Sequence, residues 1–127
     1  MPLARVLVIN DQKALAEGLA ELLSIAGFYA LHAATGQQGF DLAVEFAVDA
    51  VLLDIGLPDM SGWDVCRLLR SDPRTANVAI VIHTGSGAGP RDTPDADAFL
   101  VYPISPTEMT PVILGSIERR RQALAHL

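Results

Sequence analysis

Polar side chains that could bind a metal ion follow short apolar runs in this sequence. Asn10 and Asp11 follow the first run, Asp54 follows the third, and Thr84 and Tyr102 follow the last two. Carboxylate and amide oxygens are the ligands that a hard cation such as Mg²⁺ prefers. If the runs are neighbouring strands, the sequence predicts an oxygen-rich site suited to Mg²⁺.

Five strands must bring these residues together. Short runs rich in apolar and β-branched residues predict strands at residues 5–9, 28–33, 50–53, 78–82 and 98–101. Apolar residues at helical spacing predict helices over 13–26, after Thr35, over 63–70 and over 106–125. This alternation predicts an α/β fold with a doubly wound parallel sheet, because right-handed crossovers place helices on both faces. Sites in such sheets form where the carboxyl ends of the strands meet.

Turn and capping residues mark the ends of these helices. Gly27 is placed to end the first helix with a positive φ, and Thr35 is placed to cap the second. Asp72-Pro73 stops the third helix, since proline cannot continue it. Residues 85–97 hold too many glycines and prolines for more than one helical turn. We expect a loop there, where the alternation requires another helix.

The acids also have a purely structural interpretation, in which they cap helices or face solvent. Asp11 could cap the helix that begins at Lys13. Asp54 fits that interpretation less well, because it ends an apolar run and its nearest helix begins several residues later.

Composition restricts the class of protein. The 127 residues, half of them hydrophobic, suit a single globular domain over 1–127. A net charge of -6 argues against nucleic-acid binding. The basic run Arg119 to Arg121 is expected to complement the dipole of the last helix, and the single cysteine, Cys66, is expected in the core. With no signal peptide and no apolar run long enough to span a membrane, a cytoplasmic location is expected.

The segment from Leu53 to Gly62, Leu-Asp-Ile-Gly-Leu-Pro-Asp-Met-Ser-Gly, resembles the phosphoacceptor loop Asp-x-x-Leu/Met-Pro-x-Met-x-Gly of receiver (CheY-like) domains of bacterial two-component response regulators. Asp11, Thr84 and Phe99 occur in the order that this family requires. The resemblance implies a flavodoxin-like five-stranded sheet of order 2-1-3-4-5, with the fourth helix short or absent.

The resemblance also implies a chemistry. A histidine kinase or phosphotransfer protein would transfer a phosphoryl group to Asp54, and the domain would not be an enzyme beyond autophosphorylation from small donors and autodephosphorylation. Mg²⁺ would be held by Asp11, Asp54 and the Gly56 carbonyl, with Asn10 as a weak ligand or one acting through water. Thr84 would bind a phosphoryl oxygen, and the aromatic Phe99 would turn inward as a switch read by an unknown downstream protein.

The sequence departs from the family pattern at three places. Asn10 stands where a second acid is usual, which removes one negative charge near the cation. Tyr102 precedes Pro103 where the family has a lysine, so the cation that contacts the phosphoryl group is missing. The stretch from Gly85 to Asp97 is too short for the usual loop and helix, which alters the output face.

Two functions therefore stay open. The first is a single-domain response regulator that accepts a phosphoryl group on Asp54 in a phosphorelay. The second is a pseudo-receiver, which keeps the fold and binds proteins without phosphorylation. The intact Asp11, Asp54 and Thr84 favour the first, whereas Asn10, Tyr102 and the missing helix favour the second.

Overall fold

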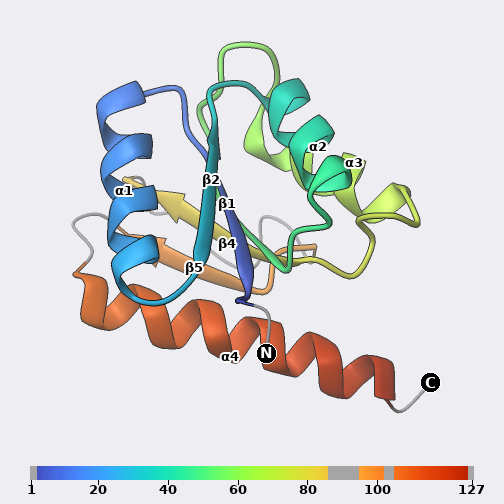
Figure 1. The fold of residues 1–127 in the computed structure, drawn as a ribbon. Helices are drawn as coiled ribbons and strands as arrows, with labels where there is room; N and C mark the ends of the chain where they lie inside the picture. Colours follow the sequence, from blue (N-terminus) through green and yellow to red (C-terminus); the bar gives the residue numbers. More distant parts are fainter. Residues whose placement is uncertain (1–2, 86–94, 102–104, 126–127) are drawn as a thin grey trace.

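The computed structural model describes residues 3–85, 95–101 and 105–125. They form one parallel sheet of five strands in the order β2-β1-β3-β4-β5, with helices on both faces (Figure 1). The strands are β1 (Arg5–Ile9), β2 (Tyr29–Ala33), β3 (Ala50–Asp54), β4 (Ala79–Thr84) and β5 (Ala98–Val101). The helices are α1 (Lys13–Ile25), α2 (Gly36–Glu45), α3 (Gly62–Ser71) and α4 (Pro106–Ala125). The predicted doubly wound sheet and its strand order are confirmed.

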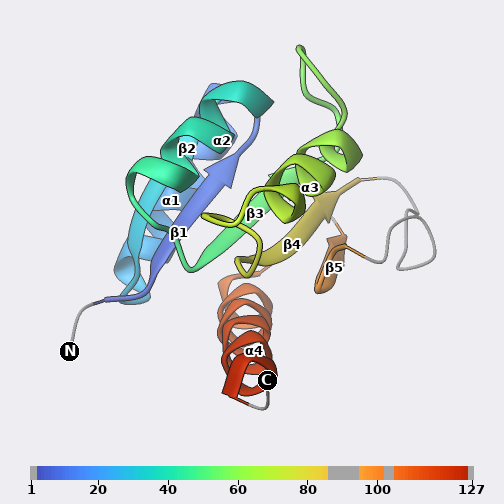
Figure 2. The same cartoon turned by 90° about the vertical axis from the view of Figure 1, so that its right-hand side faces the viewer.

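The two faces of the sheet carry separate apolar layers, because successive side chains of a strand point to opposite faces. In β1, Val6 and Val8 face α1 and α4, whereas Leu7 and Ile9 face α2 and α3. In Figure 2, α2 and α3 lie in front of the strands and α1 lies behind them. The central strands β1, β3 and β4 are buried on both faces, which explains their unbroken apolar runs.

Local signals in the sequence fix the helix ends. Gly27 has φ +102°, as predicted for the residue that ends α1. The Thr35 hydroxyl accepts a hydrogen bond from the Gln38 amide at 3.1 Å and caps α2. Asp72 is extended, as a residue before proline prefers, and α3 ends at Ser71.

Some details differ from the predictions. Strand β4 continues through His83 to Thr84, and both side chains are buried, whereas the apolar run alone suggested an end at Ile82. The predicted dipole role of the basic run was wrong, because the last turn of α4, which ends at Ala125 as predicted, holds no basic residue. Instead, Arg120 forms an ion pair with Asp97 at 2.8 Å.

Some expectations concern segments outside the described residues. Residues 86–94, which make up most of the stretch expected to lack a helix, are outside them, as is Tyr102. The residues that the structure describes contain four helices. Cys66 is buried in α3, as predicted. No helix in these described segments is long and apolar enough to cross a membrane.

Candidate functional site

The strand register brings the predicted site residues to one edge of the sheet. Ile9 pairs with Leu53, and Asp54 pairs with His83 on the other side. Asn10 and Asp11 therefore leave β1 beside Asp54, and Thr84 ends β4 one residue after the partner of Asp54. The acids, the amide and the hydroxyl thus lie on adjoining strand ends, as the sequence predicted.

Asp54 is half-buried, and its surroundings act on its charge in opposite ways. Burial raises the pKa of its carboxyl, and repulsion from the nearby Asp11 carboxylate raises it further. The backbone amides of Ile55 and Gly56 donate hydrogen bonds to the carboxylate, which lowers the pKa by a smaller amount. Two carboxylates that repel each other at one strand edge make a place where a cation is stabilised.

Asp11 does not cap α1, so the capping role considered for this acid was wrong. The N-cap residue is Gln12, and α1 has no side-chain capping bond. Asp11 is instead exposed just beyond β1, next to the site. Asn10 is only 2% exposed, and its side-chain oxygen accepts a hydrogen bond from the Gln12 amide at 2.9 Å. This bond shapes the turn that presents Asp11.

The loop from Ile55 to Ser61 is closed at its base. Gly56 and Ser61 form an antiparallel bridge, and the Gly62 amide donates to the Ile55 carbonyl at 2.7 Å. A Cβ at Gly62 would lie 2.7 Å from the Ile55 Cα, so only glycine fits there. Ser61 and Asp64 form a capping box that starts α3 immediately afterwards.

Asp59 is a site-loop residue whose role the sequence did not indicate. Its carboxylate accepts hydrogen bonds from the amides of Gly36 and Gln37 at the start of α2. One signal could have indicated it. The first turn of α2 carries no acid of its own, although a negative charge is favourable at a helix N-terminus.

Phe99, the predicted switch residue, lies in β5 and is partly buried. Its ring packs against Trp63 of α3, with 6.5 Å between the ring centroids. From the sequence, Trp63 was predicted only to begin a helix, and its contact with Phe99 was not predicted. Tyr102 was predicted to replace the family's lysine, and its position lies outside the described residues.

The donors at the strand ends fit Mg²⁺. Asp11 and Asp54 supply carboxylate oxygens, and Gly56 is exposed with open space where a Cβ would stand. Among the described residues there is no group of three His, Cys, Asp or Glu side chains that could hold a metal ion. A Mg²⁺ ion here would therefore be bound by two carboxylates and a backbone carbonyl, with water completing its octahedral shell.

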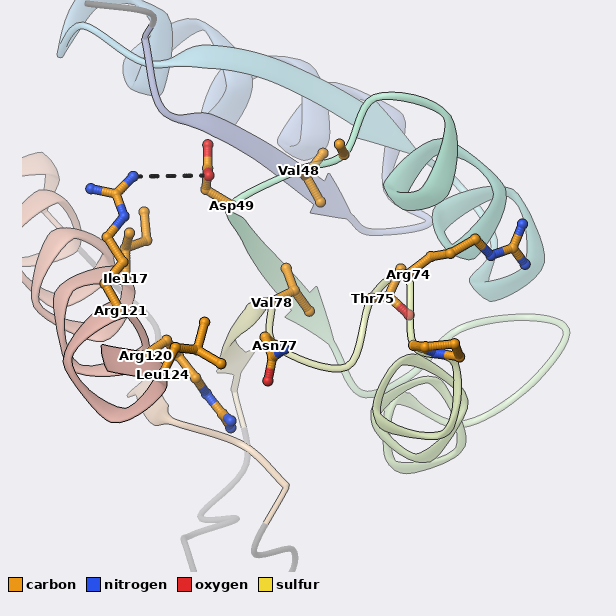
Figure 3. A pocket seen from close by; sticks show the side chains of 12 residues that line it. Val48, Asp49, Arg74, Thr75, Asn77, Val78, Ile117, Arg120, Arg121 and Leu124 are labelled. Atoms are coloured by element: carbon orange, nitrogen blue, oxygen red, sulfur yellow. Dashed lines mark ion pairs between the residues drawn. The ribbon is translucent and has the colours of Figure 1, made fainter. Parts of the chain in front are cut away.

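A cavity of about 240 Å³ lies at the other end of the strands (Figure 3). Asp49 and Val78, which precede β3 and β4, line it together with Ile117, Arg120 and Arg121 of α4. The Arg121 guanidinium lies 4.0 Å from the Asp49 carboxylate across its rim. The cavity contains none of the predicted site residues, so it is separate from the acidic edge.

Comparisons with known proteins agree with this geometry. The family model "Response regulator receiver domain" matches residues 6–113. The chain is 32% identical over 129 residues to the "DNA-binding dual master transcriptional regulator RpaA" of Synechocystis, covering 96% of this chain and 54% of that protein. It is 32% identical over 132 residues to the "DNA-binding response regulator MtrA" of Mycolicibacterium smegmatis, covering 97% of this chain and 54% of that protein. The chain thus spans about half the length of these curated relatives.

Solved structures give the same assignment. A response regulator receiver domain (CheY-like) from Methylobacillus flagellatus has a TM-score of 0.82 at 32% identity, covering 91% of this chain and 98% of that one. A receiver domain protein from Clostridium thermocellum has a TM-score of 0.84 at 27% identity, covering 95% and 99%. The chain therefore belongs to the family of response regulator receiver domains, which act in two-component signal transduction.

Proposed function

We propose that this chain receives a phosphoryl group on Asp54 and passes the signal on through contacts with other proteins. The observation that carries the proposal is the half-buried Asp54 carboxylate, placed at a strand end beside the Asp11 carboxylate. Receiver domains of response regulators interact with histidine kinases or phosphotransfer proteins. Such a protein is the proposed donor, and the receiving partner downstream is an unknown protein. The chain acts as a phosphoacceptor domain in the cytoplasm and not as an enzyme in its own right.

The transfer uses the chain's own groups in defined roles. An Asp54 oxygen attacks the phosphorus of a phosphohistidine, the P–N bond breaks, and the departing imidazole takes up a proton from water. Bound Mg²⁺ supplies positive charge that offsets the charge on the phosphoryl oxygens. Asp11, Asp54 and the Gly56 carbonyl would hold that ion. The Thr84 hydroxyl donates a hydrogen bond to a phosphoryl oxygen. Phe99, on the neighbouring strand β5, then turns inward.

Asn10 and Tyr102 support the second function, a pseudo-receiver that binds proteins without phosphorylation. The Asn10 side-chain oxygen is already bonded to the Gln12 amide, and Tyr102 brings no cation to the phosphoryl group. The relatives named above are described as DNA-binding regulators, but a net charge of -6 does not favour DNA contact by these residues. Protein contacts are therefore the proposed output in both cases.

One experiment separates the two functions. The protein is incubated with Mg²⁺ and acetyl phosphate, and its intact mass is followed together with amide NMR shifts in the presence of beryllofluoride. We expect a phosphoryl adduct and shifts around Thr84 that are lost in Asp54→Asn and kept in Asp41→Asn, an exposed acid on α2. Absence of any adduct or shift at millimolar Mg²⁺ favours the pseudo-receiver.

A further inference from the structure

The first turn of α2 has an unusual set of hydrogen-bond partners. The first four backbone amides of a helix have no acceptor within the helix. One of them, the Gln38 amide, bonds the Thr35 hydroxyl at 3.1 Å. The Gly39 amide then makes the first regular helix bond, to the Thr35 carbonyl at 3.0 Å. The Gly36 and Gln37 amides are left for an acceptor elsewhere in the chain.

Asp59 is that acceptor. Its two carboxylate oxygens accept from the Gly36 amide at 2.9 Å and from the Gln37 amide at 3.0 Å. These hydrogen bonds lower the pKa of the Asp59 carboxyl, because they favour its ionised form. A negative charge at a helix N-terminus is also favourable for the helix dipole, and α2 has no acid in its own first turn.

The bonds from Asp59 connect α2 to the loop that carries the phosphoacceptor. This loop is closed at its base by the bridge between Gly56 and Ser61. Beside Asp59, the Met60 side chain packs so tightly on Gly36 that a Cβ there would lie 2.6 Å from Met60 Cγ. The loop is therefore held at two points, at its base and along α2.

The same turn of α2 also packs against the strand that leads to Asp11. A Cβ at Gly39 would collide with the side chain of Ile9, the last residue of β1. Asn10 and Asp11 follow immediately. The start of α2 thus contacts both segments that bring the two carboxylates of the site together.

We propose that Asp59 is a positioning residue that fixes the loop carrying Asp54 and Gly56 against α2, and thereby sets their placement relative to Asp11. The proposal rests on the proposed function in one respect, because it takes Mg²⁺ binding at Asp11 and Asp54 to be the purpose of this placement. The bonds of the Asp59 carboxylate go to the amides of Gly36 and Gln37, so its proposed role is to position the loop and not to bind the ion.

The test compares Asp59→Ala with Thr35→Ala. Each variant removes acceptors from the first turn of α2, but only Asp59 belongs to the phosphoacceptor loop. Amide NMR shifts of Ile55 and Gly56 are recorded without metal, because these amides donate to Asp54. The dissociation constant for Mg²⁺ is then measured by titration, and thermal melting shows how much each change destabilises the fold.

We expect Asp59→Ala to shift the Ile55 and Gly56 amides in metal-free protein and to weaken Mg²⁺ binding about 10-fold, the effect usual for residues that orient metal ligands. Thr35→Ala should lower the melting temperature but leave both properties unchanged. Asp59→Asn, which keeps one acceptor oxygen, should fall between wild type and Asp59→Ala.

Two results overturn the proposal. One is wild-type shifts or wild-type Mg²⁺ affinity in Asp59→Ala. The other is an equal effect of Thr35→Ala, which would mean that weakening α2 in general is enough. If the wild-type protein itself binds no Mg²⁺, the proposed function fails, and the metal-free shifts alone then decide whether Asp59 positions the loop.

Discussion

At the scale of single residues, two titratable side chains on the neighbouring strands β3 and β4 have pKa values shifted in opposite directions. Asp54 and His83 are partners in the parallel register, so their side chains point to the same face of the sheet. Burial raises the pKa of the Asp54 carboxyl and lowers the pKa of His83 to about 4. Both shifts have the same physical origin, because a partly desolvated group disfavours its charged form.

The ionised Asp54 carboxylate is expected to destabilise the folded state at neutral pH. Its pKa is raised above the ordinary value of 3.8, so the folded state binds the proton more tightly than the unfolded chain. The penalty is absent below pH 3.8, grows as the pH rises through the folded pKa, and is complete above it. Asp54→Asn should therefore raise the urea midpoint at pH 7, and the difference should shrink as the pH approaches 3.8.

Mg²⁺ provides the complementary check on Asp54. The ion should raise the urea midpoint of the wild-type protein, because it binds the folded state, and should have little effect on Asp54→Asn. Asp41→Asn, on the exposed side of α2, is the control for loss of an acid in general. Equal midpoints of wild type and Asp54→Asn at pH 7 without metal would contradict this account.

His83 is expected to make the fold sensitive to mild acid. Its folded pKa of about 4 lies below the ordinary 6.5, so the unfolded chain binds the proton more tightly. Stability is complete above pH 6.5 and is lost as the pH falls toward about 4, by roughly 3 kcal/mol in all. Urea unfolding from pH 7 to 4.5 should show this slope in wild type and a flatter one in His83→Gln. The exposed His32, changed to Gln, should leave the slope as it is.

At the scale of elements, glycine positions show where local structure depends on close packing. Gly62 starts α3 against the backbone of the phosphoacceptor loop, with 2.8 Å from an added Cβ to the Asp54 carbonyl oxygen. Gly18 lies within α1, and nothing stands within 4 Å of where its Cβ would be. The same substitution should therefore have opposite effects at the two positions.

Gly62→Ala should destabilise the protein by about 1 to 3 kcal/mol, because the added methyl group must displace the backbone of Asp54 and Ile55. Gly18→Ala should stabilise it by up to about 1 kcal/mol, since alanine favours helix and meets no obstacle. Chemical denaturation of both variants measures the two effects. A neutral Gly62→Ala would mean that the loop can move away from α3.

At the scale of the whole molecule, one carboxylate joins elements that are distant in sequence. Asp97, just before β5, accepts from Arg70 of α3 at 3.0 Å and from Arg120 of α4 at 2.8 Å. The same carboxylate accepts from the Ile80 amide in β4 at 2.7 Å. Its side chain is 14% exposed, so these bonds are partly shielded from water. Asp97 thereby connects both helical layers at the β5 edge of the sheet.

Asp97→Ala should lower the free energy of unfolding by about 3 kcal/mol, because it leaves two half-buried guanidinium groups without their carboxylate. Glu17→Ala is the matched control, since Glu17 pairs with Lys13 at 3.9 Å on the exposed face of α1. That change should cost less than about 1 kcal/mol. Urea unfolding of the two variants at one pH compares them directly, and similar losses would mean that the Asp97 network contributes little.

The sequence by itself determined the order of the elements and the edge where the site forms. Strands buried on both faces must be apolar throughout, and helices must repeat their apolar residues every three or four positions, so each leaves a local pattern. The acids Asp11 and Asp54 follow such strands directly, and parallel pairing then brings them to one edge. For this reason the α/β class and the edge that carries the candidate site could be predicted from local patterns, whereas the strand order followed from the resemblance to receiver domains.

Only the tertiary structure decided which distant polar groups meet. The bonds from Asp59 to α2 span 22 and 23 residues, and Asp97 lies 27 residues from Arg70 and 23 from Arg120. The packing of Trp63 on Phe99 is likewise a contact between residues that are distant in the sequence. Each contact depends on how two separately folded elements are placed in space, and side chains at the two ends leave no periodic pattern along the chain.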